Sequence, residues 1–397
     1  METRWLTRCI PVLILIFAFA ACDVRFIAGP AVVKHGEQVQ YQLFLKPRTQ
    51  QSASNATVYL TGHVPLGWSF ASASYVTSVG GGSSGSFTVH PSDPGIITGL
   101  PPVPPNHQRV YLSAGPFSAI DDADAGTALL DFHATAAPGN YEMTFWVGVD
   151  TEECDDECMS FTLDLSVTAP SPPNTILADG LEFGTLAGWS SWRGLDGRTV
   201  AYYPLDGDAT DHSFYGNHGT PVGDPVAAVD RWGKPGGALL FDGTEDQILV
   251  DDAPSLDLTD EMTLAAWIRP TLASGPWVVG KRDLSGGLFL YSLDISGGSV
   301  RGSFRDSGGT GWIAPGYSAI VQDEWQLLVV TSDGSDLVSY LDGIVQGHVT
   351  HSGALIGTGD GGVEIGSLHD ARFGGVIDDV LIMNRALSFR EVTKLLE

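Results

Sequence analysis

The segment LLFDGTEDQILVDDAPSLDLTDEMTLAAWIRP, Leu239–Pro270, decides the fold class. Its first apolar run ends at Asp242-Gly243, a dipeptide typical of tight turns. Apolar and polar residues then alternate, and a longer apolar run, Met262–Ile268, stops two residues before the closing proline. Alternation bounded by Gly and Pro favours strands over a helix. We therefore expect two strands joined by an acidic loop.

The composition of the whole chain agrees with an all-β protein. A length of 397 residues allows two domains with their connections. Only 17% of the residues are charged, whereas 49 are Gly, which suits sandwiches with tight turns. Residues 169–198 begin with the Pro-rich run APSPP, so we interpret them as a linker between two domains.

The chain is strongly acidic, with 47 acidic against 20 basic residues and a formal net charge of −27. This balance argues against nucleic acid as a partner, because no Lys/Arg stripe is present to neutralise phosphates. It keeps a secreted protein soluble and supplies carboxylates for hard divalent cations such as calcium. Most single carboxylates are nevertheless expected to be solvated surface groups.

Residues 1–22 have the features of a signal peptide. Basic residues precede the apolar run Ile10–Phe19, and small residues precede Cys22. The apolar run is short for a membrane span, which needs about 20 residues. Residues 18–20 fit an A-x-A cleavage site, whereas residues 19–22 resemble a bacterial lipobox in which Cys22 is lipidated. Both alternatives predict an extracytoplasmic protein, either secreted or held to a membrane only by its lipid.

The cysteine count bears on this choice. Cys154 and Cys158 lie in one short loop, CDDEC, and Cys9 is lost with the signal peptide. If Cys22 is acylated, the other two can pair and no thiol remains. Ordinary secretion would leave one free thiol in an oxidising compartment. The parity favours lipidation and predicts a Cys154–Cys158 disulfide that rigidifies a hairpin tip.

The first domain, residues 23–168, contains several short strand-like runs. Val39, Tyr41 and Leu43 alternate with glutamines. Further runs occupy residues 56–60, 86–89, 109–113, 127–135, 141–149 and 160–167. This spacing predicts a β-sandwich, which in its general pattern resembles a bacterial immunoglobulin-like module. The letters G-x-S-x-G at 81–85 lie in a Gly/Ser-rich stretch of this all-β region, so we interpret them as a loop and not as a nucleophile elbow.

The second domain, residues 199–397, carries a series of motifs in a fixed order. They are D-x-S-x-x-G-N-x-G at 211–219, FDG at 241–243, W-x-x-x-V-V at 325–330, Y-x-D-G at 340–343 and NRALS at 384–388. Their order and spacing resemble the laminin-G-like, concanavalin-A-like jelly-roll family. The resemblance implies two stacked antiparallel sheets. Ser388 and Glu391 form a capping box that predicts a short terminal helix.

The family resemblance also implies that turns meeting at a sheet edge can hold a structural calcium ion. The candidate ligands are Asp206, Asp208, Asp242 and Asp379, because carboxylates and loop carbonyls suit this ion. The alternative is that each Asp bonds the backbone of its own turn. Both interpretations stay open for Asp242 and Asp379, and turn bonding is favoured for the other two.

Carbohydrate binding is the second functional candidate. Sugar sites use exposed aromatic rings and nearby polar groups on loops over a rigid scaffold. Trp277, Trp312 and Tyr317 lie in Gly/Ser/Pro-rich stretches that we expect to be exposed loops, with Trp232 as a weaker candidate. The alternative is that these rings only cap the edge of the sandwich.

A catalytic role is disfavoured by the sequence. A glycosidase needs two carboxyl groups facing each other, and no E-x-D-x-x-E run is present. Asp378 and Asp379 are adjacent on one strand, so we expect them to point to opposite faces. The leading hypothesis is a non-catalytic protein that binds a glycan or another extracellular ligand. The alternative is a structural or adhesive surface lipoprotein that uses both domains for protein contacts, and a polysaccharide hydrolase ranks third.

Overall fold

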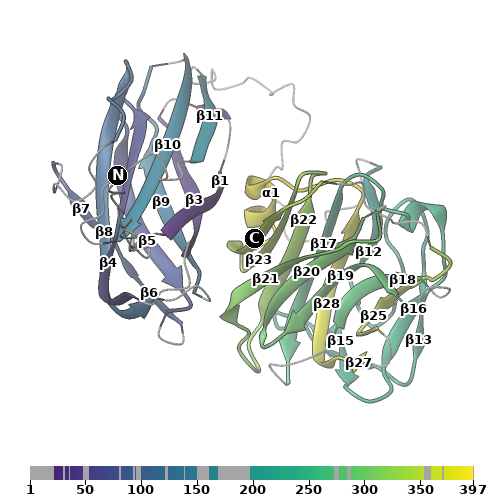
Figure 1. The fold of residues 1–397 in the computed structure, drawn as a ribbon. Helices are drawn as coiled ribbons and strands as arrows, with labels where there is room; N and C mark the ends of the chain where they lie inside the picture. The colour runs from purple at the N-terminus through teal and green to yellow at the C-terminus, as the bar shows by residue number, and fades with distance from the viewer. Residues whose placement is uncertain are drawn as a thin grey trace, which may run out of the picture.

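The structure of the protein is a computed structural model, and its described part is almost entirely β-strand (Figure 1). It describes residues 22–29, 32–34, 36–47, 53–79, 82–92, 94, 100–120, 124–137, 139–149, 161–168, 197–271, 277–283, 288–306, 308–352, 359–368 and 371–396. The predicted signal peptide before Cys22, the Cys154–Cys158 loop and the linker up to residue 196 lie outside the described residues, as does the side chain of Cys22. Within the described part, no helix combines the length and hydropathy that crossing a membrane requires.

The N-terminal domain is a sandwich of two sheets. One sheet has the order β1 (Cys22–Ala28), β3 (Gln38–Pro47), β9 (Gly126–His133), β5 (Ser69–Thr77) and β6 (Ser83–Ser86). The other has the order β2 (Val32–Lys34), β11 (Phe161–Thr168), β10 (Gly139–Val149), β4 (Ala53–Pro65), β8 (His107–Ile120) and β7 (Thr88–His90). Tyr41, Leu43, Leu60, Phe132 and Phe145 pack between the sheets. Two β layers are thus present, and the immunoglobulin-like character stays a prediction.

The C-terminal domain is a larger sandwich. Its eight-stranded sheet has the order β14 (Val226–Val229), β15 (Pro235–Asp242), β28 (Gly374–Met383), β17 (Met262–Pro270), β22 (Gln326–Ser332), β23 (Asp336–Leu341) and β24 (Ile344–Thr350), with β12 (Thr199–Tyr203) paired to β28. The seven-stranded sheet has the order β13 (Gly219–Val222), β16 (Gln247–Val250), β25 (Val363–Ile365), β18 (Trp277–Asp283), β19 (Leu288–Ser296), β20 (Ser299–Arg305) and β21 (Gly311–Ala319). A shared apolar core lies between the two sheets. The strands β26 (Ser367–Leu368) and β27 (Ala371–Arg372) form a separate two-stranded hairpin.

The segment Leu239–Pro270 contributes to both sheets. It forms three strands, not the two that we expected: β15 and β17 flank β28 in the eight-stranded sheet, whereas β16 belongs to the seven-stranded sheet. A 3₁₀ turn, η2 (Pro254–Leu256), lies in the acidic loop. The segment therefore crosses between the layers twice, which explains its importance for the jelly roll.

Two local predictions are confirmed. The carboxylate of Glu391 accepts the backbone N–H of Ser388 at 2.8 Å, which completes the capping box of helix α1 (Phe389–Lys394). Leu395 after the helix is 1% exposed. Asp342 and Gly343 both have positive φ, 50° and 72°, as a type I′ turn between β23 and β24 requires.

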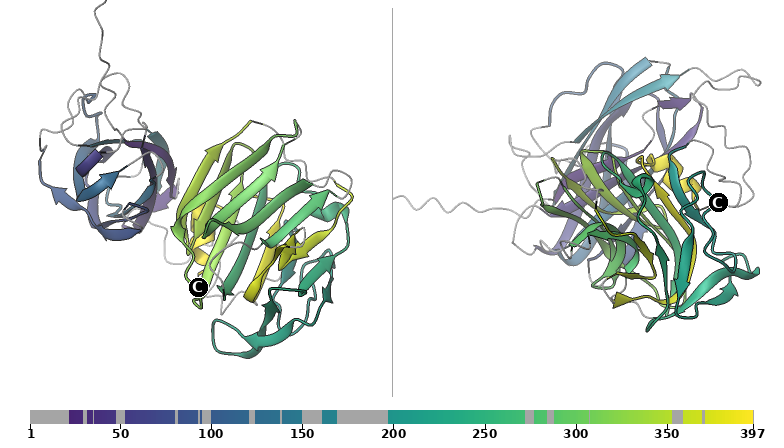
Figure 2. Two further views of the ribbon diagram at one scale, coloured as in Figure 1. Left: turned by 60° about the horizontal axis from the view of Figure 1, so that its bottom comes forward. Right: turned by 90° about the vertical axis from the view of Figure 1, so that its right-hand side faces the viewer.

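The two domains lie side by side and share a buried contact (Figures 1 and 2). Gln42 of β3, 1% exposed, donates from Nε2 to the carbonyl of Gly343 at 3.0 Å and accepts the N–H of Val345 at 2.9 Å. Thr127 donates to the carbonyl of Val345 at 2.6 Å. Phe44 joins the apolar cluster on the outer face of the eight-stranded sheet, together with residues of α1. The glutamine face of β3 is therefore an interdomain surface.

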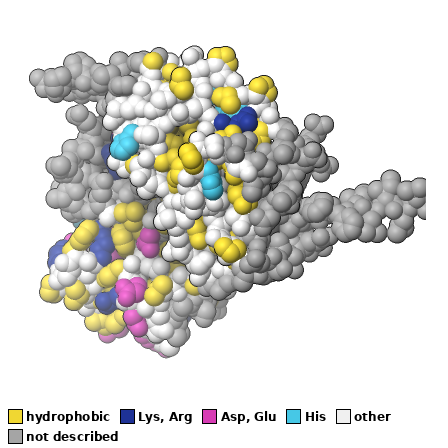
Figure 3. Space-filling view, turned by 90° about the vertical axis from the view of Figure 1, so that its left-hand side faces the viewer, with side chains coloured by type: hydrophobic (Ala, Val, Ile, Leu, Met, Phe, Trp, Pro, Cys, Tyr) yellow, Lys and Arg dark blue, Asp and Glu magenta, His cyan; other side chains and the backbone are white. Residues whose placement is uncertain are grey.

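Charged side chains are unevenly distributed on the face that Figure 3 shows. Acidic and basic side chains gather along its lower edge, while hydrophobic, histidine and uncharged side chains make up most of its upper part. No stripe of Lys and Arg crosses the described surface in this view. This agrees with the acidic composition.

Candidate functional site

The four predicted calcium ligands each have partners within the protein. Asp206 pairs with Lys234 Nζ at 2.7 Å, and Asp208 accepts the N–H of Thr210 at 2.9 Å. Among the described residues, no three His, Cys, Asp or Glu side chains form a group that could hold a metal ion. The set Asp206, Asp208, Asp242 and Asp379 thus does not fit a shared calcium site, because each carboxylate already bonds its own turn or a neighbouring cation.

Asp242 shows the turn-bonding alternative clearly. Its Oδ1 accepts the backbone N–H groups of Thr244 at 2.7 Å and Glu245 at 3.1 Å, and the Thr244 hydroxyl bonds the other oxygen. These hydrogen bonds stabilise the charged form and hold the pKa of the Asp242 carboxyl well below its usual range. The carboxylate therefore fixes the turn after β15.

The three predicted sugar-binding aromatics lie in strands instead of loops, and two of them have other partners. Tyr317 in β21 stacks on Phe44, with ring centroids 6.1 Å apart, and its hydroxyl donates to Thr127 at 2.8 Å. Burial in this interdomain contact raises the pKa of Tyr317. Trp312 in β21 donates from Nε1 to Asp306 at 2.7 Å and packs against the core. Neither ring is the exposed platform that we expected.

Trp277 alone of the three lies on a polar outer face. It starts β18 and pairs with Asp294 of β19, whose Oδ1 accepts Arg301 Nε at 2.7 Å. The Arg301 guanidinium lies over the Trp277 ring, 5.3 Å from its centroid. Burial raises the pKa of Asp294, and the pairing with Arg301 opposes this shift. The indole, the guanidinium and the carboxylate thus hold one another in place.

Other side chains extend this face. Ser292 and Ser303 bond each other at 2.6 Å, and Ser292 also donates to the Asp294 carboxylate at 3.1 Å. Phe289 lies 5.9 Å from Trp277 between ring centroids. We call the following six residues the Trp277 face: Trp277, Phe289, Ser292, Asp294, Arg301 and Ser303. Ser292, Asp294 and Ser303 are 0%, 1% and 1% exposed, so the half-buried Trp277, Phe289 and Arg301 form its accessible part.

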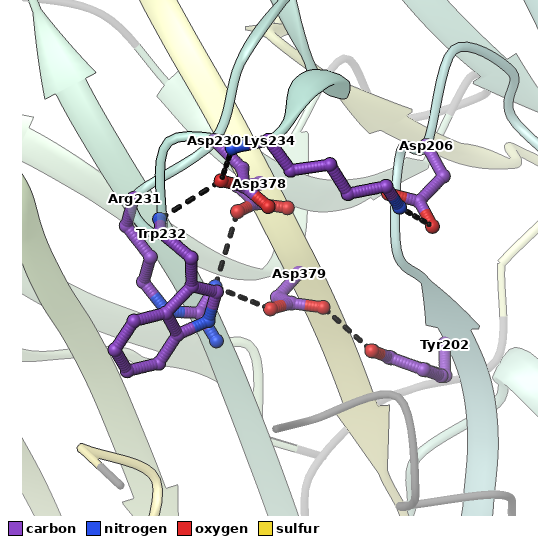
Figure 4. A network of polar contacts seen from close by, with 8 residues as sticks. All are labelled: Tyr202, Asp206, Asp230, Arg231, Trp232, Lys234, Asp378 and Asp379. Carbon is purple, nitrogen blue, oxygen red and sulfur yellow. Dashed lines mark hydrogen bonds and ion pairs between the residues drawn. The ribbon is translucent and has the colours of Figure 1, made fainter. Parts of the chain in front are cut away.

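A second polar network lies on the outer side of the eight-stranded sheet (Figure 4). Arg231 Nη1 bonds Asp378 at 3.0 Å and also Asp379, and Tyr202 donates its hydroxyl to Asp379 at 2.5 Å. Burial raises the pKa of Asp378 to about 8, helped by the neighbouring Asp379 charge. Burial likewise raises the pKa of Asp379, against the attraction of Arg231.

The adjacent carboxylates reach one arginine because β28 is bulged. Ala265 pairs with Leu381 and Trp267 with Asp378, so two residues of β28 oppose the single Ala266. Asp379 takes a left-handed φ of 47°. A bulge interrupts the alternation of side chains. The expectation that the two carboxylates point to opposite faces is therefore wrong.

The ion pair between Asp294 and Arg301 was not predicted from the sequence, although a local turn pattern indicates it. Gly297 and Gly298 both have positive φ and close a two-residue hairpin between β19 and β20. Counting outward from this turn places Asp294 opposite Arg301 and Ser292 opposite Ser303. No comparable sequence pattern predicts the bulge at Asp379.

Comparison with known proteins identifies the second domain. The sequence model of the concanavalin A-like lectin/glucanases superfamily, laminin-G type, matches residues 242–393. The C-terminal half of the chain therefore contains a concanavalin A-like jelly-roll domain, as the motifs predicted. No curated protein matches the chain.

Several solved structures are similar to half of the chain. Domain 4 of AbnA, a GH43 extracellular arabinanase from Geobacillus stearothermophilus solved with arabinotriose, has 19% identity and a TM-score of 0.42, over 50% of this chain and 98% of that one. The binding domain of Paraclostridial Mosquitocidal Protein 1 has 16% identity and a TM-score of 0.42, over 50% and 52%. The botulinum neurotoxin serotype G binding domain has 15% and 0.41, over 50% of each chain. The chain thus spans about half the length of the two toxin binding domains.

Proposed function

We propose that the C-terminal jelly roll is a non-catalytic glycan-binding domain of an extracytoplasmic protein. The observation that carries the proposal is the Trp277 face, where a half-buried indole lies beside the Asp294–Arg301 ion pair. An indole packs against the apolar face of a sugar ring, and fixed charged groups bond its hydroxyls. The signal-like residues 1–22 support the location outside the cytoplasm.

The carboxylates support binding over hydrolysis. Asp378 and Asp379 are 2% and 6% exposed and share Arg231, so they do not face each other across an open groove. Glycoside hydrolysis needs an acid and a nucleophile or base on either side of the scissile bond, about 5–9 Å apart. The superfamily name includes both lectins and glucanases, and this arrangement of carboxylates favours sugar binding over glucanase activity.

A printed array of oligosaccharides tests the proposal on the full chain. We expect binding that is weakened in Trp277→Ala and unchanged in Phe214→Ala, because Phe214 is 73% exposed but lies in the loop between β12 and β13. A blank array would instead favour the alternative of a structural or adhesive lipoprotein. Release of reducing sugar from a polysaccharide panel would contradict the non-catalytic assignment.

A further inference from the structure

Trp232 is an exposed aromatic side chain on a fixed loop. It is 60% exposed, in the turn between β14 and β15. The buried carboxylate of Asp230 accepts the backbone N–H groups of Trp232 and Lys234, both at 2.8 Å. Gly233 has a φ of 84°, a conformation that few other residues adopt readily. The backbone that presents the indole is therefore held in one conformation.

The indole itself rests on a support built from the sheet. The Arg231 guanidinium lies between two rings, 5.0 Å from the centroid of Trp232 and 4.8 Å from that of Trp267. Asp378 and Asp379 hold the same guanidinium from the side, as Figure 4 shows. A platform fixed in this way loses little conformational entropy on binding.

The surroundings of Trp232 define the chemistry of a ligand. Lys234 and Asp206 form an exposed ion pair at 2.7 Å that offers a donor and an acceptor. Arg231 behind the ring and Lys234 nearby disfavour a cationic ligand on the indole. The net charge of −27 disfavours an anionic one. A neutral ring with one apolar face and peripheral hydroxyls fits best.

We infer that Trp232 is the stacking residue of a second sugar-binding surface, which takes a neutral pyranose or furanose ring of the glycan proposed above. Trp232 lies against Arg231, whose guanidinium lies over Trp267, a member of the apolar cluster outside the eight-stranded sheet. Trp277 lies on the outer side of the seven-stranded sheet. The two surfaces are thus on opposite sides of the sandwich, and one short oligosaccharide cannot span them. The domain binds two sugar chains and cross-links polysaccharides.

Calorimetry on the full chain tests this inference, which rests on the proposed glycan binding. The probes are short gluco-, xylo-, manno-, galacto- and arabino-oligosaccharides, followed by light scattering with the polysaccharide of the best probe. We expect two sugars per wild-type chain and one in either Trp232→Ala or Trp277→Ala. Scattering from cross-linked polysaccharide should be lost in both variants. Trp232→Phe should keep the second site with about tenfold weaker binding, and Phe214→Ala should behave as wild type.

The outcomes separate the two proposals. One sugar per wild-type chain, lost in Trp277→Ala and unchanged in Trp232→Ala, would overturn the second surface and leave the proposed function intact. One sugar lost only in Trp232→Ala would support this surface and contradict the Trp277 face. No binding by any probe would overturn both. The melting temperature of Trp232→Ala should stay close to that of wild type, because the replaced ring is exposed.

Discussion

Replacing Gln42 by Ala should uncouple the two domains. The Gln42 side chain takes the place of a neighbouring strand, because it both donates to the Gly343 carbonyl and accepts the Val345 N–H across the interface. It is 1% exposed, so water does not take over these bonds while the domains remain docked. The substitution leaves one buried donor and one buried acceptor unsatisfied.

The size of the effect follows from these two groups. An unsatisfied buried polar group costs about 1–3 kcal/mol, so with two such groups the docked state should lose roughly 2–6 kcal/mol. For a domain of this size about 1 kcal/mol shifts Tm by roughly 2–4 °C. We therefore expect the less stable domain to melt about 4–24 °C earlier in Gln42→Ala than in wild type.

Differential scanning calorimetry of the full chain can measure this shift. The wild type should give one cooperative transition or two overlapping ones, and Gln42→Ala should separate them. Gln38→Ala is the matched control, because Gln38 lies on the same strand and is exposed. Identical melting curves for the two variants would refute the reasoning.

Three further predictions concern the C-terminal domain. The raised pKa of Asp378, about 8 against 3.8, means that the folded state binds its proton more tightly than the unfolded state, so this contribution to stability is present at low pH and is lost as pH rises towards 8. Asp378→Asn should therefore reduce the fall in Tm between pH of about 4 and about 8, and an unchanged slope would contradict the burial argument. Gly302→Ala should destabilise the domain by about 1–3 kcal/mol in a urea titration, because its Cβ would lie 2.1 Å from Val330 Cγ2, whereas Gly311→Ala, with no atom within 4 Å, should be neutral. Because no three acidic, His or Cys side chains of the described residues form a metal-binding group, adding calcium or a chelator should leave Tm unchanged, and a clear calcium-dependent rise would show that a site exists.

Local patterns were sufficient for much of the fold. Alternation of Val39, Tyr41 and Leu43 with glutamines predicted a strand, whose apolar side lies in the core, and the spacing of Ser388 and Glu391 predicted the terminal helix. These features depend on a few neighbouring residues, because strands repeat every two residues and a capping box spans one helical turn. The same logic, applied to the Gly297-Gly298 hairpin, would have paired Asp294 with Arg301.

The candidate sites were harder to predict, because their residues are brought together by distant segments. Trp277 was recognised as a candidate, yet Tyr317 looked equivalent until the first domain was seen to cover it. The contact of Arg231 with two adjacent carboxylates depends on the bulge in β28, and a bulge arises from pairing with β17 and not from the DD dipeptide itself.

The amino-acid sequence by itself determined that the chain is all-β, that it has two domains, and that the second is a jelly roll. Turn residues and two-residue alternation, which are local properties of the chain, indicated the all-β domains, and the order of the motifs in the second domain resembled the concanavalin-A-like family. Only the tertiary structure decided which polar and aromatic side chains face solvent, a ligand surface or the other domain. The environment of each side chain depends on which surfaces of the folded chain meet. A glutamine or tyrosine on a strand can form hydrogen bonds either with water or with groups of another domain, so its sequence position does not decide between them.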